Sequence, residues 1–527
     1  MKTLFGSANM KIFWVTFGFA FAAFLVIIGS VTIYVSWVLL IIWALVSSSL
    51  NPKERLGLFL LVLPFFLVLP GLGSDTLSSW RIALLVLAML SIRDLLKSGN
   101  KKSISEAFGK YGFRSPELWI GLIILLGILS ALWARFPLVT LKFVSFVLNA
   151  GLVYLVASVA VRDRTGLFGI LKYLSISTGF IILIGFFQFV ATFFIDQYWF
   201  WQYWAIRVIA PFYGQGLAGV LSYSNSWFSF TGEGQHLRMF SVLPDSHSFA
   251  VICIFFIAAS VPWLGWVSVR FSSKSDRFRK RSKLILWYAI RLAGLGVVLS
   301  GTRGVWVGML VPLVIVGVLY SLKEYRKLMS KWMISLLLIL LLFLVSPLFD
   351  YAVAKLHYSS DSYLARVASI YDLTESSNTG RMAIWLSSYQ FALRHPLGVG
   401  LGNFIVANNT VAEGGFQVIA NTVNSRFNLP QRFVTAHNTY LHLWVELGIL
   451  GLVLIVALLW TLLVQGLKLL REHRKRDQST VLVELSILIL FAWLAGYAFF
   501  DVALFNDRVL IYTFVFLALL NKSKQYA

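Results

Sequence analysis

Apolar runs of about 20 residues recur along the whole chain, and they constrain its fold more than any other feature. At 1.5 Å per residue, a helix of this length crosses a hydrocarbon layer roughly 30 Å thick. Of the 527 residues, 59% are hydrophobic and 13% are charged, a composition that water-soluble domains do not have. We therefore expect an all-α fold, a polytopic bundle of transmembrane helices with a large, partly helical external loop.

The apolar runs predict about fourteen spans, and twelve are possible if short neighbouring runs merge. Lysine and arginine gather in every second connection, which the positive-inside rule assigns to the cytoplasm. This topology accounts for the net charge of +23, so the charge gives no reason to expect nucleic acid as a partner. The predicted spans are 12–28, 32–48, 57–72, 80–92, 116–134, 138–161, 166–194, 248–269, 284–301, 305–322, 332–347, 437–465, 481–500 and 508–520.

The spans and their connections divide the chain into five segments. Residues 1–194 contain the N-terminal spans, residues 248–347 the central spans and residues 437–527 the C-terminal spans. Two long connections, residues 195–247 and residues 348–436, fall outside the membrane by the same alternation. External connections are where binding and catalytic residues concentrate, so we seek the function there.

The two external segments differ in composition. The first is rich in Trp, Tyr and Phe, which is typical of a segment lying in the membrane interface, and a sugar-binding platform is the alternative. The second contains one helical pattern from Arg381 to His395, which Pro396 and Gly398 end.

Arginine dominates the basic residues of the predicted external face, where lysine is limited to Lys355. The planar guanidinium binds phosphate or carboxylate through two parallel hydrogen bonds, which an ammonium cannot do. The bias therefore predicts that the external face binds an anion, although some of these arginines could pair with acids of the same loop. The external arginines are Arg207, Arg238, Arg303, Arg366, Arg381, Arg394, Arg426, Arg432 and Arg508.

Two of these arginines have informative surroundings. Arg303 lies in "LSGTRGVWVG", a short turn between two spans, where adjacent glycines leave backbone N–H groups open to an anion. Arg381 follows "ESSNTG" at the start of the predicted helix, where Asn378 or Thr379 could cap it. The positive end of the helix dipole also favours an anion beside Arg381.

The stretch "TAHNTYLHLWVELGILG", residues 435–451, begins an otherwise apolar span with a polar cluster. Thr435 is a plausible N-cap, which places His437 in the first turn of the helix. The helix dipole disfavours imidazolium there, and a neutral histidine can accept a proton as a general base. The residues alone favour this role no more than that of a histidine that anchors the helix at the interface.

Further along the same span, His442 and Glu446 are spaced four residues apart on one helical face. Such a pair could ligate a metal, but only two ligands are evident, so we expect an internal hydrogen-bonded pair and no metal site. We expect Gly448 and Gly451 to allow close helix packing rather than ligand contact. Cys253 is the only cysteine, which excludes an intramolecular disulfide and any multi-cysteine metal site.

Taken together, these motifs resemble the bacterial O-antigen ligase and O-antigen polymerase superfamily, membrane glycosyltransferases of the GT-C type. The family's ligase signature is His, then Asn, Ser or Gln, nine residues and Gly-x-x-Gly, which His437, Asn438, Gly448 and Gly451 match. "SGTRG", "TGRMAIW" and "HPLGVGLGNF" resemble three further pieces of the family pattern, in the same order. The resemblance covers about residues 230 to 465, and the chain has about two spans more than the twelve typical of the family.

The resemblance implies a glycan donor carried on undecaprenyl pyrophosphate at the outer surface of the bacterial cytoplasmic membrane, among the membrane lipids. It also implies an inverting transfer that uses no nucleotide sugar, no cofactor and no metal. On this chain, Arg303 and Arg381 would bind the pyrophosphate, and His437 would deprotonate the hydroxyl of a glycolipid or glycan acceptor. The predicted catalytic residues are therefore His437, Arg303 and Arg381.

A further family position matches Arg238 in "HLRMFSVLPDSHSFA", where the usual Pro-Asn is replaced by Pro244 and Asp245. The resemblance makes this region a candidate for substrate contacts. The predicted substrate-binding residues are Arg238, Asn438, Asp245, His247 and Glu233.

The acceptor separates the functions within the superfamily. It is the lipid A core for a ligase, a repeat unit for a polymerase and a protein hydroxyl for an O-oligosaccharyltransferase, and we favour the ligase. A transporter of a lipid-linked glycan is the alternative of another class. Transporters driven by ions use acidic or polar groups at mid-membrane, whereas acids within the spans here are few, with Glu446 and Glu484 as the main ones.

Overall fold

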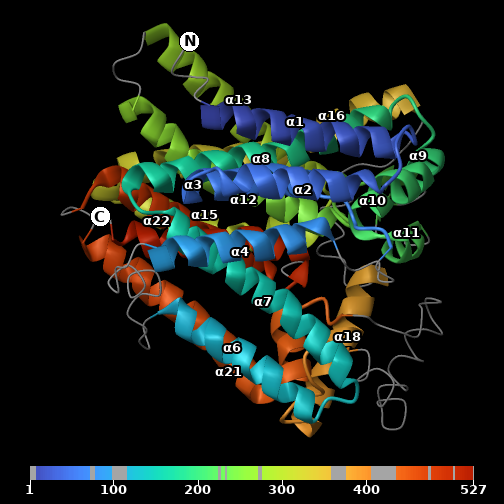
Figure 1. Ribbon diagram of the computed structural model, residues 1–527. Coiled ribbons are helices and arrows are strands. Elements are labelled where there is room, and N and C mark those ends of the chain that lie inside the picture. The colour runs from blue at the N-terminus through green and yellow to red at the C-terminus, as the bar shows by residue number, and fades with distance from the viewer. Residues whose placement is uncertain are drawn as a thin grey trace.

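The computed structural model describes residues 7–71, 78–97, 115–222, 227–231, 234–270, 276–357, 376–404, 435–472, 476–502 and 505–525. These residues form a helical bundle (Figure 1). The longer helices are α1 (Ser7–Ile27), α2 (Val35–Ser48), α3 (Pro52–Val62), α4 (Ser79–Lys97), α6 (Pro116–Leu129), α7 (Pro137–Ala160), α8 (Arg164–Ala191), α12 (Ser246–Arg270), α13 (Asp276–Leu299), α14 (Arg303–Gly308), α15 (Leu310–Ser321), α16 (Lys323–His357), α18 (Ser376–Arg394), α21 (Thr439–Glu472), α22 (Gln478–Tyr497) and α23 (Asp507–Ser523).

Helices coincide with all the predicted spans, and the all-α membrane fold is confirmed. Within the described ranges, 8 helices are long and apolar enough to cross a membrane. The predicted span 305–322 consists of two helices in succession, α14 and α15. The described chain also contains one element that the all-α prediction lacked, a short hairpin of β1 (Phe228–Thr231) and β2 (Gly234–Leu237).

Several helices extend beyond the predicted spans, and two cases have a clear local reason. The predicted span 57–72 begins instead at Pro52, because Asn51 caps α3 and exchanges hydrogen bonds with Glu54. A short 3₁₀ helix then ends this segment at Phe65. The predicted span 332–347 continues as α16 to His357, into the segment assigned to the external loop, because a proline at its end need not stop a helix whose later turns remain hydrogen-bonded.

The centre of the bundle is α12, which contacts α8, α13 and α22. Its side chains from Phe249 to Ala259 are buried on all sides of the helix. A helix that is apolar around its whole circumference gains most from such a position, because each face can pack against another apolar helix.

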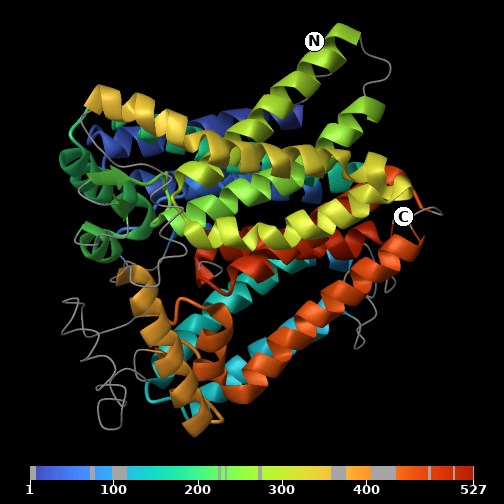
Figure 2. The ribbon, with the colours of Figure 1, turned by 180° about the vertical axis from the view of Figure 1, so that it is seen from behind.

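Two helices leave the main bundle at an angle. In Figures 1 and 2, α6 and α21 run side by side below the other helices, and α18 crosses near the start of α21. The first turns of α21 still contact α22. This arrangement brings the beginning of α21 to the main bundle and takes its later turns away from it.

The aromatic segment 195–247 folds onto one end of the bundle, which we term the aromatic end, through α9 (Gln197–Tyr203), α10 (Ala210–Tyr213) and α11 (Gln215–Ser222). A π-helix, η3 (Trp204–Ile209), joins α9 to α10. The C-terminus lies at the opposite end (Figure 1).

Several tryptophans of the aromatic segment are structural. The indole N–H of Trp204 donates to the Ser241 carbonyl (2.8 Å), and that of Trp227 donates to the Pro244 carbonyl (2.7 Å). Both rings are buried, whereas Trp199 is exposed. The buried rings therefore fasten the segment to the bundle and are not open for stacking on a sugar.

Candidate active site

His437 lies directly before α21 in a left-handed backbone conformation, with φ of 46°. The side-chain oxygen of Asn438 accepts a hydrogen bond from the Leu441 N–H (3.0 Å), so Asn438 caps the helix. The prediction that Thr435 is the N-cap was wrong: its hydroxyl instead accepts from the His437 N–H (3.4 Å). His437 is thus held in the turn before the helix and not in its first turn. Non-glycine residues seldom adopt this conformation, which is typical of functional positions.

Contacts between two helix ends bring Asp501 to His437. The Thr439 N–H donates to the Ala498 carbonyl (2.8 Å), and the Thr439 hydroxyl donates to the Asp501 carbonyl (2.7 Å). The side chains of His437 and Asp501 then face each other, with 3.9 Å between Nδ1 and Oδ1. The His437 side chain is 42% exposed, and that of Asp501 is 8% exposed. One edge of the imidazole is therefore open while the other faces a buried carboxylate.

A second histidine contacts the same carboxylate. His247, in the first turn of α12, places Nδ1 against Oδ2 of Asp501. The Tyr497 hydroxyl lies 3.0 Å from the same nitrogen. Three segments, at the starts of α12 and α21 and at the end of α22, therefore meet at one aspartate.

The charge of Asp501 is stabilised by its neighbours. Burial alone would raise the pKa of Asp501. Interactions with His247 above all, and with His437 and Arg381, outweigh burial, and the pKa of this carboxyl lies well below its usual range. Asp501 is ionised at neutral pH.

The surroundings of His437 favour its neutral form. Burial of the ring is the largest cause that lowers the pKa of His437. Asp501 opposes this shift, whereas the charges of Arg381, His247 and His442 add to it, and the net pKa is lowered. The sequence predicted a neutral histidine from the helix dipole, and the structure supplies burial and positive neighbours as causes.

Arg381 lies inside α18, which begins at Ser376. The prediction that Asn378 or Thr379 caps this helix was wrong, since both lie in its first turn. The charge of Arg381 lowers the pKa of both Asp501 and His437. Arg381 is therefore close enough to affect the pKa of His437, the histidine predicted to act with it in catalysis.

Arg303 is the first residue of α14 and is 7% exposed. Two glycines let α14 approach the end of α22 closely. A Cβ on Gly304 would meet Cβ of Phe500 at 2.5 Å, and a Cβ on Gly308 would meet the Tyr497 backbone nitrogen at 2.8 Å. Because Phe500 directly precedes Asp501, this packing places the start of α14 beside His247, His437 and Asp501, which we term the histidine–aspartate cluster.

Arg238 follows the hairpin and approaches the same turn. Its Cγ is 3.5 Å from the position that a Cβ on Gly301 would take, and Gly301 has a φ of 63°. The Arg238 N–H donates to the Trp227 carbonyl (2.8 Å). Arg238 thus packs against Gly301, two residues before Arg303. The two arginines, which were predicted from separate motifs, therefore lie near each other.

Asp245 caps the start of α12. Its carboxylate accepts hydrogen bonds from the Ser248 N–H (2.6 Å) and the Ser248 hydroxyl (3.0 Å). Burial is the largest cause that raises the pKa of Asp245. Its contact with an acceptor stays a prediction, as does that of His247, and Glu233 lies outside the described residues.

His442 and Glu446 form the internal pair that the sequence predicted, with 3.3 Å between Nε2 and Oε1. The remaining ring nitrogen of His442 accepts from the Ala436 N–H (3.4 Å), and Oε1 of Glu446 accepts from the Phe404 N–H (3.1 Å). The pair therefore links the backbone next to His437 to the loop that follows α18.

Gly448 interrupts α21, with φ of 68°. The sequence predicted close helix packing at Gly448 and Gly451. At Gly448 the loop after α18 packs instead, and the atoms nearest a Cβ on Gly451 belong to Leu447 and Leu443 of the same helix. The Ile449 N–H donates to the Pro396 carbonyl (3.0 Å), and the Gly400 N–H donates to the Glu446 carbonyl (2.8 Å). The loop after α18 is thereby fixed to the helix that begins beside His437.

Arg508 is one external arginine whose role is structural. It is 1% exposed, and its guanidinium lies 4.6 Å from the ring centroid of Tyr213. It donates to the carbonyls of Pro64 (3.5 Å) and Phe66 (3.4 Å). The anion-binding prediction therefore does not extend to Arg508, and Arg366, Arg426 and Arg432 lie outside the described residues.

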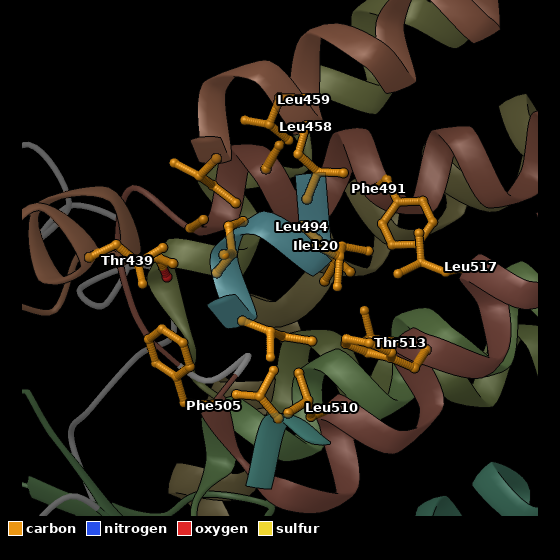
Figure 3. Close-up of a pocket in the computed structure, with 18 of the residues that line it drawn as sticks. Ile120, Thr439, Leu458, Leu459, Phe491, Leu494, Phe505, Leu510, Thr513 and Leu517 are labelled. Atoms are coloured by element: carbon orange, nitrogen blue, oxygen red, sulfur yellow. The ribbon is translucent and has the colours of Figure 1, made fainter. Parts of the chain in front are cut away.

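Two apolar hollows flank the first turns of α21. One, of about 200 Å³, lies among α6, α7, α21, α22 and α23, and Figure 3 shows its lining from Thr439 to Leu517. The other, of about 800 Å³, lies among α15, α21 and α22, and its lining follows α21 from Tyr440 to Leu470. Both hollows begin within three residues of His437.

Asp501 and Tyr497 were not among the predicted site residues. The sequence contains one signal for Asp501, an isolated acid at the outer end of the predicted span 481–500. Such an acid is also common at the end of an ordinary span, so nothing in the sequence pairs it with His437. Only the packing of α21 against α22 makes that pairing visible.

Comparison with known proteins gives one family. Residues 288–456 match the family described as O-antigen ligase. The matched region includes Arg303, Arg381 and His437, and ends before Asp501. No curated protein matches the chain.

Proposed function

Because the chain belongs to the O-antigen ligase and polymerase superfamily, we propose that it transfers a glycan from undecaprenyl pyrophosphate to an acceptor hydroxyl at the outer face of the bacterial cytoplasmic membrane. The proposed acceptor is the lipid A core, which makes the protein an O-antigen ligase. The observation that carries the proposal is the neutral, half-exposed His437 beside the ionised Asp501.

His437 acts as the general base. Its open edge takes the proton of the acceptor hydroxyl, and the acceptor oxygen attacks the anomeric carbon of the donor sugar. As that bond forms, the bond between the anomeric carbon and the phosphate oxygen breaks, and undecaprenyl pyrophosphate leaves with the electron pair. Asp501 lies on the far side of the imidazole, where its negative charge stabilises the imidazolium that forms.

Arg303 and Arg381 act on the leaving group. Negative charge grows on the pyrophosphate as the sugar departs, and fixed guanidinium groups stabilise that charge in surroundings with little water. Arg303 is buried at the start of α14, and the charge of Arg381 reaches His437 and Asp501. With this charge supplied by arginine, we propose a transfer that needs no metal and inverts the anomeric configuration.

The two apolar hollows support lipid-borne substrates. The larger one follows most of α21, and an extended polyprenyl chain has the length and the chemistry to lie along it. The smaller one begins at Thr439 and shares Tyr440, Leu459 and Leu462 of α21 with the larger one. It offers a place for the acyl chains of a second lipid, which favours an acceptor carried on a lipid over a protein hydroxyl.

Repeat-unit polymerisation is the second candidate, because its acceptor is also carried on a lipid and the same hollows suit it. Transport of a lipid-linked glycan is less well supported. An ion-driven transporter would hold its ion near the middle of the spans. His247, His437 and Asp501 instead lie at helix ends.

A transfer assay tests the proposal. Purified protein is incubated with a lipid-linked oligosaccharide and separately with lipid A core, a peptide or no added acceptor, and the products are separated by size. A ligase forms product only with lipid A core, whereas a polymerase lengthens the glycan without added acceptor. The absence of any product with every acceptor would contradict the proposal.

His437→Ala tests the base in the same assay. We expect turnover to fall by roughly 10²–10⁴ while donor affinity stays nearly unchanged, because the base acts in the transition state and not in donor binding. His395→Ala is the matched control, since His395 is exposed and stacks on Phe391. Weakened donor binding with unchanged turnover in His437→Ala would assign that side chain to substrate binding instead.

A further inference from the structure

We propose that His247 is a positioning residue of this site: it holds the Asp501 carboxylate between two imidazoles and, when protonated, keeps His437 unprotonated. The inference rests on the proposed function, in which His437 is the base. It assigns to His247 a contact inside the protein, in place of the acceptor contact that the sequence suggested.

The geometry places one carboxylate between two histidines. Oδ2 of Asp501 contacts Nδ1 of His247, and Oδ1 lies 3.9 Å from Nδ1 of His437. Within the described part of the chain, Nδ1 of His437 is buried and has no hydrogen-bond partner. Asp501 is thus in contact with His247 and lies just beyond hydrogen-bond distance of His437.

Other contacts fix the carboxylate in this position. The Val502 N–H donates to Oδ1 of Asp501 (2.6 Å), and the Tyr497 hydroxyl lies 3.0 Å from Nδ1 of His247. The side chains of Asp501 and His247 are 8% and 18% exposed, so little water competes for them. A buried carboxylate with such partners keeps its orientation as the charge of a neighbour changes.

The charges around His437 explain why the charge of His247 matters. Asp501 favours the protonated form of His437, while Arg381, His247 and His442 disfavour it. A side chain at position 247 that carries no positive charge cannot oppose the attraction of Asp501 for a proton on His437. His437 then holds a proton up to a higher pH, and less of it is available as a base at neutral pH.

The experiment compares variants that separate charge from hydrogen bonding. His247→Asn retains a side-chain N–H that can donate to Asp501 but carries no charge, whereas His247→Lys retains a positive charge. In each purified protein, the rate at which diethyl pyrocarbonate modifies His437 is measured against pH by peptide mapping. The reagent attacks only the unprotonated ring, and the His437 side chain is 42% exposed to it.

We expect the midpoint for His437 to rise by roughly one pH unit in His247→Asn and to stay near the wild-type value in His247→Lys. The exposed His395 is an internal reference, and its midpoint should be the same in all variants. An unchanged His437 midpoint in a folded His247→Asn would overturn the proposal. Should that variant aggregate, His247→Gln provides a second neutral side chain for the same comparison.

Transfer measured on the same variants separates this inference from the proposed function. Transfer needs neutral His437, so activity rises with pH through the pKa of His437. This rise is the acidic limb of the pH–activity profile, and a raised pKa moves it to higher pH. We therefore expect the limb to move up in His247→Asn along with the modification midpoint. If the modification midpoint of His437 shifts as expected but no protein, wild type included, shows transfer, the inference about His247 stands and the proposed function is contradicted.

Discussion

At the residue scale, the site depends on the shape of its arginines as well as on their charge. Arg303 and Arg381 reach the cluster from separate helices, one buried at the start of α14 and one inside α18. Two guanidinium groups can bind a pyrophosphate through paired hydrogen bonds, whereas ammonium groups would supply only point charges.

Substitution by lysine tests this requirement. We expect Arg303→Lys and Arg381→Lys each to lower transfer by roughly tenfold or more, because the charge remains and the planar fork is lost. Arg394→Lys, at the exposed last residue of α18, is the control and should retain wild-type activity. Wild-type rates in both test variants would show that these positions supply only positive charge.

At the element scale, the break in α21 connects the parts of the site. The loop after α18 is held at Gly448 by backbone hydrogen bonds, and the pair of His442 and Glu446 continues that contact to the backbone beside His437. The helix that carries Arg381 and the turn that carries His437 are therefore fixed to each other through the first turns of α21.

Gly448→Ala should disrupt this connection. A Cβ at Gly448 would meet the Pro396 carbonyl oxygen at 2.1 Å, and the φ of 68° is itself unfavourable for alanine. We expect a loss of stability of about 1–3 kcal/mol, seen as a lower thermal midpoint in detergent, together with reduced transfer.

Gly317→Ala is the matched control for that substitution. Gly317 lies in α15, and no atom lies within 4 Å of the position that its Cβ would take. Its thermal midpoint should equal or slightly exceed that of the wild type, because alanine is the better helix former. Equal thermal midpoints in the Gly448 and Gly317 variants would show that the loop adapts without cost.

At the scale of the whole molecule, the aromatic segment, the cluster around Asp501 and the start of α12 lie together, and the C-terminus lies at the opposite end of the bundle (Figure 2). The alternation of basic connections predicts that the aromatic end faces outward. The proposed reaction requires this orientation, because its donor is presented at the outer surface.

Single cysteines in a Cys253→Ala background test the orientation in intact cells. An impermeant thiol reagent should label Gln202→Cys, in α9, and Arg394→Cys, at the end of α18, since both positions are exposed and predicted to lie outside. Lys280→Cys, exposed near the start of α13 in a predicted cytoplasmic connection, should react only after the cells are opened. Labelling of position 280 in intact cells would contradict the predicted topology.

The class of fold follows from the sequence alone, because span length and hydropathy are local properties that each segment carries wherever it packs. The sequence also singled out His437, Arg303 and Arg381, since each lies in a short motif whose residues are neighbours in the chain. It predicted the pair of His442 and Glu446 for the same reason, as a spacing of four residues fixes proximity on a helix.

The tertiary structure decided what joins these motifs. Asp501 follows α22 and His247 lies in the first turn of α12, both far from His437 in the sequence, and no local pattern relates the three. Hydrogen bonds from Thr439 to the end of α22 and the contact of His247 with Asp501 create the cluster. Contacts between segments far apart in sequence depend on how whole helices pack, and hydropathy does not specify the partner of each helix end. That is why the sequence located His437 and named His247 separately, while only the folded chain showed the aspartate that joins them.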